Sequence, residues 1–357
     1  MNHGYTALPE LQRLIDAGEA AEREGQKQRA RSLYEQALYA LREPGQAPLA
    51  GALLRWCARS HLEEGNADAA AEIAAAALRV SELAEDRAGV AHANNVLGNC
   101  DFERGDMEGA EALYTLARSQ ARAAGDNLLV AMAEQNAGIV ANIRGDYRLA
   151  MKRYRASLAG HRALGRSAYV AHALNNVGML CTDLRRWRAA ERAFGEAMEV
   201  CAEVGDTVTL ARVAGNRIEP WIAQRRWRQA REACYEALRM AEAAGETSTM
   251  GEVQKHLGVI ARETGDHAAA ARHLAAAERI AEERGDVVLQ AETAREQARL
   301  HWEGHHHRET LQALNRAHRL FSRLQARRDL ADVDEQIRGL ESLFLNIVEQ
   351  WGQSIES

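Results

Sequence analysis

Small residues recur along this chain with a period of 40 residues, and larger apolar side chains lie between them. Alanine occupies seven of the eight positions that the period defines from Ala30 onward. A second phase, counted from Ala37, holds only Ala or Ser, and a third, counted from Gly51, holds only Gly or Ala. Small side chains at fixed phases let two helix backbones approach closely, with Leu and aromatic residues filling the grooves beside them. The pattern therefore predicts helices packed in a regular stack.

Two turn signals divide each repeat unit. The first begins at Gly25 and is glycine at five of eight positions, and the second begins at Gly45 and is glycine at six of eight. Glycine ends a helix because it adopts the left-handed conformation without a Cβ penalty. We therefore expect two helices of roughly 16 residues in each unit. One such hairpin cannot bury its apolar face alone, whereas a stack can, and it curls into a superhelix with a concave face.

The residues of the third unit resemble a tetratricopeptide repeat, with Leu97-Gly98, Gly105-Asp106, Ala110-x3-Tyr114 and Ala117 in the family's order. The later segments Ala150-x3-Tyr154 and Ala190-x3-Phe194 repeat the pattern. The unit is longer than the family's usual length of about 34 residues, and the early Trp and closing Pro are missing. Such long units resemble those of bacterial regulatory proteins and of kinesin-light-chain-type adaptors.

This resemblance implies an all-α fold, a right-handed superhelical solenoid of about eight helical hairpins followed by a long C-terminal helix. It covers roughly residues 11–330. We expect an N-terminal tail over residues 1–10, the solenoid over 11–329 and the C-terminal helix over 330–357.

The resemblance also implies that the first helix of each hairpin lines the concave face and contacts a ligand. Asn amides both donate and accept hydrogen bonds, so a series of them suits the backbone of an extended peptide. The alternative is that these amides bond neighbouring helices or solvent. The predicted ligand contacts are His92, Asn95, Asn99, Gln135, Asn136, Asn142, His172, Asn175, Asn176, Asn216 and Arg217.

Chaperone-binding relatives hold a C-terminal carboxylate with a clamp of lysine and asparagine. The corresponding positions here are Asn95, Gln135 and Asn175 rather than lysine. The resemblance therefore does not predict a chaperone carboxylate as the ligand.

Two of the first turns depart from glycine in the same way, because the tetrapeptide Arg-Arg-Trp-Arg occupies both. One period separates the two copies, so they lie side by side on one edge of the stack. Arginine pairs bidentately with carboxylate or phosphate, so this edge could hold an acidic partner. The favoured alternative is a solvated turn with each Trp packed into the second helix. The basic edge comprises Arg185, Arg186, Arg188, Arg225, Arg226 and Arg228.

Two local features mark the later units. Pro220 falls inside an expected first helix and should kink it or leave a carbonyl unpaired. A histidine cluster, His301 with His305 to His307, lies at the last repeat turn. Consecutive residues of a turn point in different directions, and no carboxylate or Cys lies at ligand spacing, so no metal site is predicted.

Composition excludes several classes of protein. Four prolines and 5% aromatics argue against a β-sandwich, a barrel or a doubly wound sheet. A net charge of −6 disfavours nucleic acid and anionic membrane as partners. No signal peptide or membrane-length apolar run is recognised, and the five scattered cysteines are expected to be buried thiols in a reducing cytoplasm. No phosphate loop, dinucleotide motif, metalloprotease motif or nucleophile elbow occurs, so no enzymatic activity and no cofactor are predicted.

The repeat pattern gives way to a heptad near the C-terminus. A helix of about 28 residues would be ~42 Å long and would outrun the stack. Its stripe could cap the last repeat or form a two-helix seam in a homodimer. The heptad positions are Leu330, Val333, Ile337, Leu340, Phe344, Ile347 and Trp351.

The last residues, from Phe344 to Ser357, resemble the helix that leads into bacterial HD-GYP-type phosphodiesterase domains. The metal-binding motifs of such a domain are not in this chain. The resemblance implies a sensory or partner-binding region of a longer bacterial signalling protein, which binds a protein or peptide and relays its state through the C-terminal helix. The alternatives are a stand-alone structural adaptor and a peptide-responsive cytoplasmic regulator.

Overall fold

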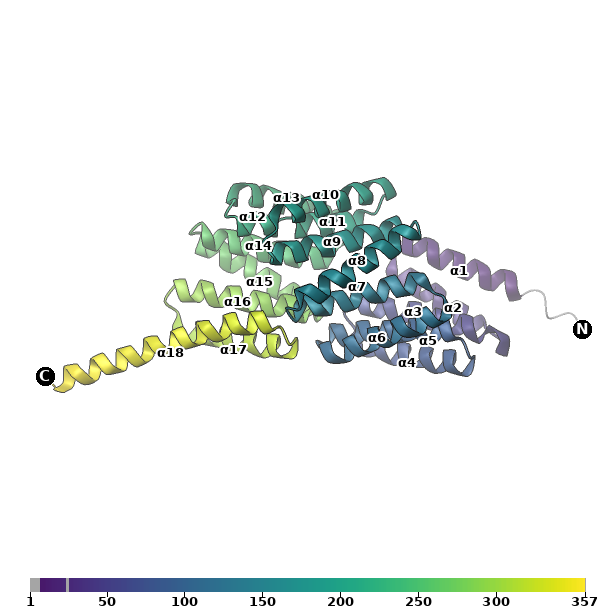
Figure 1. Ribbon diagram of the computed structural model, residues 1–357, viewed down its shortest axis with the longest axis horizontal. Helices are drawn as coiled ribbons and strands as arrows, with labels where there is room; N and C mark the ends of the chain where they lie inside the picture. Colours follow the sequence, from purple (N-terminus) through teal and green to yellow (C-terminus); the bar gives the residue numbers. More distant parts are fainter. Residues whose placement is uncertain (1–6, 24–25, 357) are drawn as a thin grey trace, which may run out of the picture. The chain divides into compact units, whose positions relative to one another are not determined.

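The computed structural model describes residues 7–23 and 26–356 of the 357-residue chain. The chain falls into two compact units, residues 1–140 and 141–357. Figure 1 shows that the described elements are helices, joined one after another by short turns. No strand occurs in these described segments. The all-α fold is therefore confirmed.

The first unit consists of paired helices, in which α1 packs on α2, α3 on α4 and α5 on α6. Its elements are α1 (Ala7–Arg23), α2 (Lys27–Ala40), the short 3₁₀ helix η1 (Pro44–Gln46), α3 (Ala47–Glu63), α4 (Ala67–Leu83), α5 (Arg87–Glu103), α6 (Met107–Ala124) and most of α7 (Asn127–Ile143).

The second unit continues the same arrangement, in which α9 packs on α10, α11 on α13, α14 on α15 and α16 on α17. Its further elements are α8 (Tyr147–Ala163), α9 (Ser167–Asp183), α10 (Trp187–Val204), α11 (Thr207–Asn216), α12 (Glu219–Ala223), α13 (Trp227–Ala244), α14 (Thr247–Glu263), α15 (His267–Arg284), α16 (Val287–Glu303), α17 (His307–Arg323) and α18 (Arg327–Glu356).

The small residues of the repeat lie where the helices meet. Ala70, Ala110 and Ala190 are buried, as the period predicts. The aromatic side chains of Tyr114 and Phe194, four residues after the alanines, are buried beside them. Burial of these residues in each hairpin supplies the apolar contact that a single hairpin lacks, so the stack is the stable unit.

Aspartate caps define where the second helix of a hairpin begins. The carboxylate of Asp106 accepts a hydrogen bond from the backbone N–H of Gly109 at 3.0 Å, and Asp146 and Asp266 cap α8 and α15 in the same way. Such a cap satisfies one of the backbone donors that a helix start leaves free, and it stabilises the helix by about 1 kcal/mol.

The turns hold one residue in the left-handed region, whether or not that residue is glycine. Gly125 has φ of 74°, and Glu85, at the same phase one period earlier, has φ of 54°. Arg185, Arg225 and His305 adopt the same conformation at the other turn. The stack therefore imposes the left-handed conformation on these residues, although their Cβ atoms disfavour it.

Replacing Glu85 with glycine is expected to stabilise the first unit by about 0.5–1 kcal/mol, because the left-handed strain is removed at an exposed position. Gly125→Ala is the matched opposite and is expected to destabilise by about 1 kcal/mol. Urea unfolding followed by circular dichroism measures both changes, and the same sign for the two variants would contradict the argument.

The sixth unit is irregular at Pro220, as the sequence predicts. The first helix breaks into α11 and α12, and Ile218 between them is fully buried. Proline lacks the N–H that would bond the carbonyl four residues earlier, so the helix cannot run through it. The break places Glu219 at the start of α12.

The C-terminal helix α18 runs past the position where the period would require a turn near Leu345, as the heptad predicts. Val333 and Leu340 are buried, and α18 packs on α17, whereas Phe344 and Leu345 are exposed. The first half of the stripe therefore caps the stack. The side chains of Ile347 and Trp351 lie outside the described residues, so a dimer seam stays a prediction.

The five cysteines are all buried and free, as expected from the sequence. Burial raises the pKa of Cys57 to about 11 and that of Cys234 to about 12, which keeps both thiols protonated. Within the described segments, no helix is both long enough and apolar enough to cross a membrane.

Candidate functional site

In the first unit, the predicted Asn residues bond one another across neighbouring first helices. The Asn136 amide on α7 donates to the Asn95 oxygen at 3.2 Å and to the Asn99 oxygen at 3.1 Å, both on α5. Tyr114 on α6 donates to Asn99 at 2.9 Å. Asn95 is buried, so its amide joins repeats, as in the alternative interpretation of these residues. A direct ligand contact by Asn95 stays a prediction.

His92 and Gln135 lie on the same first helices. The imidazole of His92 is 2.8 Å from the carboxylate of Asp126, which also caps α7. Desolvation lowers the pKa of His92, so the ring is neutral at physiological pH. The Oε1 atom of Gln135 is buried and has no hydrogen-bond partner among the described residues. Gln135 therefore keeps an acceptor that a bound N–H or water could satisfy.

The second unit repeats this arrangement two periods later. Asn216 donates to the buried Asn175 at 3.0 Å, and His172 is hydrogen-bonded to Thr209 at 3.2 Å. Burial lowers the pKa of His172 to about 4. The guanidinium of Arg217 lies over the Trp221 ring, 5.1 Å from its centroid.

The remaining predicted contacts differ in their surroundings. Asn142 donates to the carboxylate of Asp183 at 3.2 Å. Asn176 is half-buried and has no hydrogen-bond partner in the described part of the chain. The structure therefore brings together five of the eleven predicted residues, Asn95 and Asn99 with Asn136 and Asn175 with Asn216. It leaves the Asn176 side chain and the Oε1 atom of Gln135 free for a ligand.

A set of charged side chains, which we call the inner ring, occupies the same helices in the second unit and continues onto α18. Several members shift one another's pKa, and Arg328 contacts Asp183. The inner ring comprises Asp183, Glu219, Glu252, Lys255, Glu292, Arg295, Arg328 and Asp329.

Lys255 lies at the centre of the inner ring, with 12% of its side chain exposed. Its Nζ atom lies 2.6 Å from Glu252 Oε2 and also contacts Glu292 on the next first helix. The two carboxylates raise the pKa of Lys255, and Lys255 in turn lowers that of Glu292. Lys255 is one of only three lysines in the chain. Its compact charge is already neutralised by protein carboxylates, so it is not free to hold a ligand carboxylate.

Glu219 is the least satisfied carboxylate of the inner ring. Its side chain is exposed to solvent, and it has no hydrogen-bond or ion-pair partner among the described residues. Even so, desolvation by the surrounding protein raises its pKa to about 7. A carboxylate that water can reach, but that protein surrounds closely, is placed to receive a cationic group.

Asp183 ties the inner ring to the C-terminal helix. Arg328, in the first turn of α18, lies 3.8 Å from the Asp183 carboxylate and donates to the Tyr147 hydroxyl at 2.9 Å. Burial raises the pKa of Asp183 to about 6. The Asp183 carboxylate on α9 therefore links the beginning of the second unit to its last helix, α18.

The sequence prediction missed most of the inner ring. Lys255 and Arg295 occupy the same phase of the repeat as Asn95 and Asn175, so counting that phase through the later units would have found them. Asp183 and Glu219 lie at other phases and had no repeat signal.

The predicted basic edge is exposed at all six arginines. Arg226 lies 3.5 Å from Glu191, which joins the starts of α13 and α10 and places the two tetrapeptides side by side. Trp227 is half-buried against the core around Ile218, as the solvated-turn interpretation requires.

The histidine cluster contacts aromatic rings. The His307 ring lies 5.6 Å from that of Trp302 and 5.8 Å from that of Phe344, between centroids. Within residues 7–23 and 26–356, no three side chains of metal-ligand type come together.

A tetratricopeptide repeat family profile matches residues 89–163, which span nearly all of α5 and the whole of α6, α7 and α8. This part of the chain therefore consists of tetratricopeptide repeats. The repeats are the hairpins described above, and the unusually long unit is confirmed by helices of 17 or 18 residues, such as α9 and α10. No curated protein matches the sequence.

Several solved structures share this tetratricopeptide fold at low sequence identity. A Rap protein complexed with competence and sporulation factor is 14% identical, with a TM-score of 0.61, and the match covers 95% of this chain and 98% of that one. The Rap conjugation gene regulator of plasmid pLS20, in complex with the Phr* peptide, is 15% identical, with a TM-score of 0.64 over 79% and 80%. Aspartyl phosphate phosphatase F from Bacillus subtilis is 13% identical, with a TM-score of 0.61 over 78% and 72%.

These matches concern the repeat fold. The resemblance of the last residues to the lead-in of HD-GYP-type phosphodiesterases stays a prediction, as do the cytoplasmic location and the absence of enzymatic activity.

Proposed function

We propose that this tetratricopeptide repeat protein binds a peptide or an extended protein segment along the inner ring of its second unit. The observation that carries the proposal is Glu219, an exposed carboxylate without a partner in the described segments, surrounded by charged side chains from successive first helices. An extended peptide lying across these helices would meet one polar group per repeat. The peptide seen in complex with the structurally similar pLS20 regulator supports this class of ligand.

The charge of the inner ring favours a ligand with a basic group. Lys255, Arg295 and Arg328 each contact carboxylates of the ring, whereas Glu219 contacts no cation. A Lys or Arg side chain, or a peptide amino terminus, would supply the missing charge. The half-buried Asn176 amide is placed on α9 to bond the peptide backbone.

The finer proposal is that ligand binding is relayed to α18. Asp183 belongs to the inner ring and also holds Arg328 in the first turn of α18. A ligand cation that attracts Asp183 would weaken this contact and change the start of the helix. This change at the start of α18 is what a signalling role would require, whether α18 leads to an output domain of HD-GYP type or forms a homodimer. A rigid adaptor would not.

Selection from a random peptide library displayed on phage tests the binding proposal. We expect enriched peptides to carry Lys or Arg, and Glu219→Gln to weaken their binding about tenfold. Because protonation of Glu219 removes its charge, binding of a basic peptide should fall as the pH drops from about 8 to about 6. The matched control is Glu236→Gln, an exposed position on the second helix α13, which should bind as well as the unmodified chain.

No enrichment, or equal binding by the Glu219 and Glu236 variants, would contradict the proposal. Hydrogen exchange at the start of α18, with and without an enriched peptide, separates relay from adaptor. Unchanged exchange there would leave the adaptor as the function.

A further inference from the structure

The six arginines of the basic edge form a strongly positive surface away from the inner ring. All six side chains are exposed. Arg226 contacts Glu191, and Arg228 contacts Glu232 at 3.0 Å. The other four, Arg185, Arg186, Arg188 and Arg225, have no carboxylate partner in the part of the chain that the structure describes.

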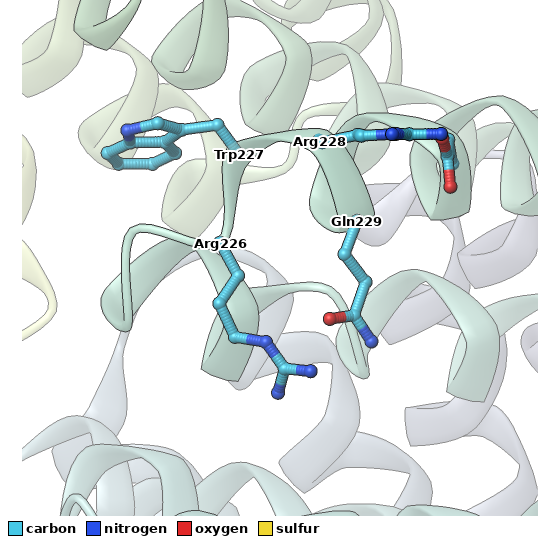
Figure 2. Close-up of a pocket in the computed structure, with 5 residues that line it drawn as sticks. Arg226, Trp227, Arg228 and Gln229 are labelled. Atoms are coloured by element: carbon cyan, nitrogen blue, oxygen red, sulfur yellow. The ribbon is translucent and has the colours of Figure 1, made fainter.

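The surface is hollowed at the start of α13. A depression of about 420 Å³ is lined by Arg226, Trp227, Arg228, Gln229 and Glu232. In Figure 2, Arg226 and Gln229 extend to the same side of the helix start, whereas Trp227 extends away from them. Trp227 packs against the core, so it holds the turn in place and leaves the polar side chains to face a partner.

Both helix starts on this edge add to its positive potential. At α8 and α15 an aspartate caps the helix, but Arg186 and Arg226 occupy the same position in α10 and α13 and make no capping hydrogen bond. The uncapped backbone N–H groups carry the positive end of the helix dipole. Two adjacent repeats thus replace a carboxylate with an arginine.

We propose that this basic edge is a docking surface for a carboxylate-rich segment of another protein. Four unpaired guanidinium groups on two neighbouring turns offer bidentate partners to Asp and Glu side chains spaced along one segment. The positive surface spans only two repeats, in a chain whose net charge is −6. That net charge repels a long polyanion such as a nucleic acid, while a short acidic segment meets only the edge.

The test uses the full chain and a fluorescein-labelled peptide of alternating Glu and Asp, with fluorescence anisotropy as the readout. The variant is Arg186→Asp with Arg226→Asp, which reverses two charges and introduces the aspartate found at this position in α6, α8 and α15. We expect the unmodified chain to bind the peptide with an affinity that falls as salt rises, and the variant to lose about tenfold or more. Circular dichroism on heating should show the variant to be at least as stable as the unmodified chain.

The matched control is Arg239→Asp with Arg279→Asp. These two arginines are exposed, lie one period apart on α13 and α15, and are remote from the helix starts. The control should keep its peptide affinity to within about twofold, although its net charge changes equally. Equal losses in both variants, or no peptide binding by the unmodified chain, would overturn the proposal.

A single-stranded DNA oligonucleotide of the same net charge separates the two sources of anionic groups. Tighter binding of the DNA than of the peptide would overturn the acidic protein segment as the partner. The outcome is independent of the inner ring, because the library-selected basic peptides should bind the Arg186 and Arg226 variant unchanged.

Discussion

Replacing Lys255 with methionine is expected to destabilise the second unit by about 2–3 kcal/mol at neutral pH. Removing one partner from a buried ion pair commonly costs about 3–5 kcal/mol, and the partial exposure of Glu252 and Glu292 reduces the effect. Without Lys255, these two carboxylates and Glu219 would repel one another with no cation between them.

The loss should depend on pH in a defined direction. Desolvation raises the pKa of Glu219 from 4.5 to about 7 and also raises that of Glu252, so folding favours their protonated forms. The stability that these groups contribute is fully present below about pH 4.5 and is lost as the pH rises through 7. Removing Lys255 raises both pKa values further, so the Lys255→Met variant should recover most of its stability between about pH 8 and pH 5.

Urea unfolding at these two pH values measures the effect. Lys152→Met is the matched control, since Lys152 is exposed on α8 and has no ion pair in the described segments. We expect the control to change stability by less than about 0.5 kcal/mol at either pH. A loss in the Lys255 variant that is equal at pH 8 and pH 5 would show that packing, rather than charge, is what Lys255 supplies.

The fold could be predicted from sequence because its determinants are local and repeat. Glycines and aspartates at fixed phases mark most of the turns, and the period also identifies the turns at Arg185 and Arg225, which adopt the left-handed conformation although neither is glycine. Pro220 gave the break between α11 and α12 for an equally local reason. These features depend on residues a few positions apart, which a single sequence displays directly.

The site could be predicted only in part, because its partners come from distant repeats. The positions at which Asn recurs identified the helices that meet. They did not show that the side chains of Asn95 and Asn175 would accept hydrogen bonds from the neighbouring repeat. The contact of Arg328 with Tyr147 joins residues 181 positions apart. Such a contact depends on the small rotation between successive repeats, which accumulates over the second unit. The sequence pattern does not give the size of that rotation.

Gly178 shows how closely the repeat depends on its small residues. A Cβ atom at this position would lie 2.6 Å from a ring carbon of Phe194, which is fully buried between α9 and α10. Gly178→Ala is therefore expected to destabilise the unit by about 1–2 kcal/mol, because the overpacking exceeds the gain of about 1 kcal/mol in helix propensity. Urea unfolding with hydrogen exchange in α9 and α10 measures the change.

Gly195 offers a control in the same hairpin. It lies within α10, and a Cβ atom there would meet nothing within 4 Å. The same substitution, Gly195→Ala, should therefore stabilise the unit by up to about 1 kcal/mol, since only the helix propensity changes. Phe194→Leu in the Gly178→Ala background should recover part of the loss, because the smaller side chain leaves room for the new methyl group. If both alanine variants were stabilised, the two helices could move apart without penalty, and the close approach at Gly178 would not be what fixes the register of α9 on α10.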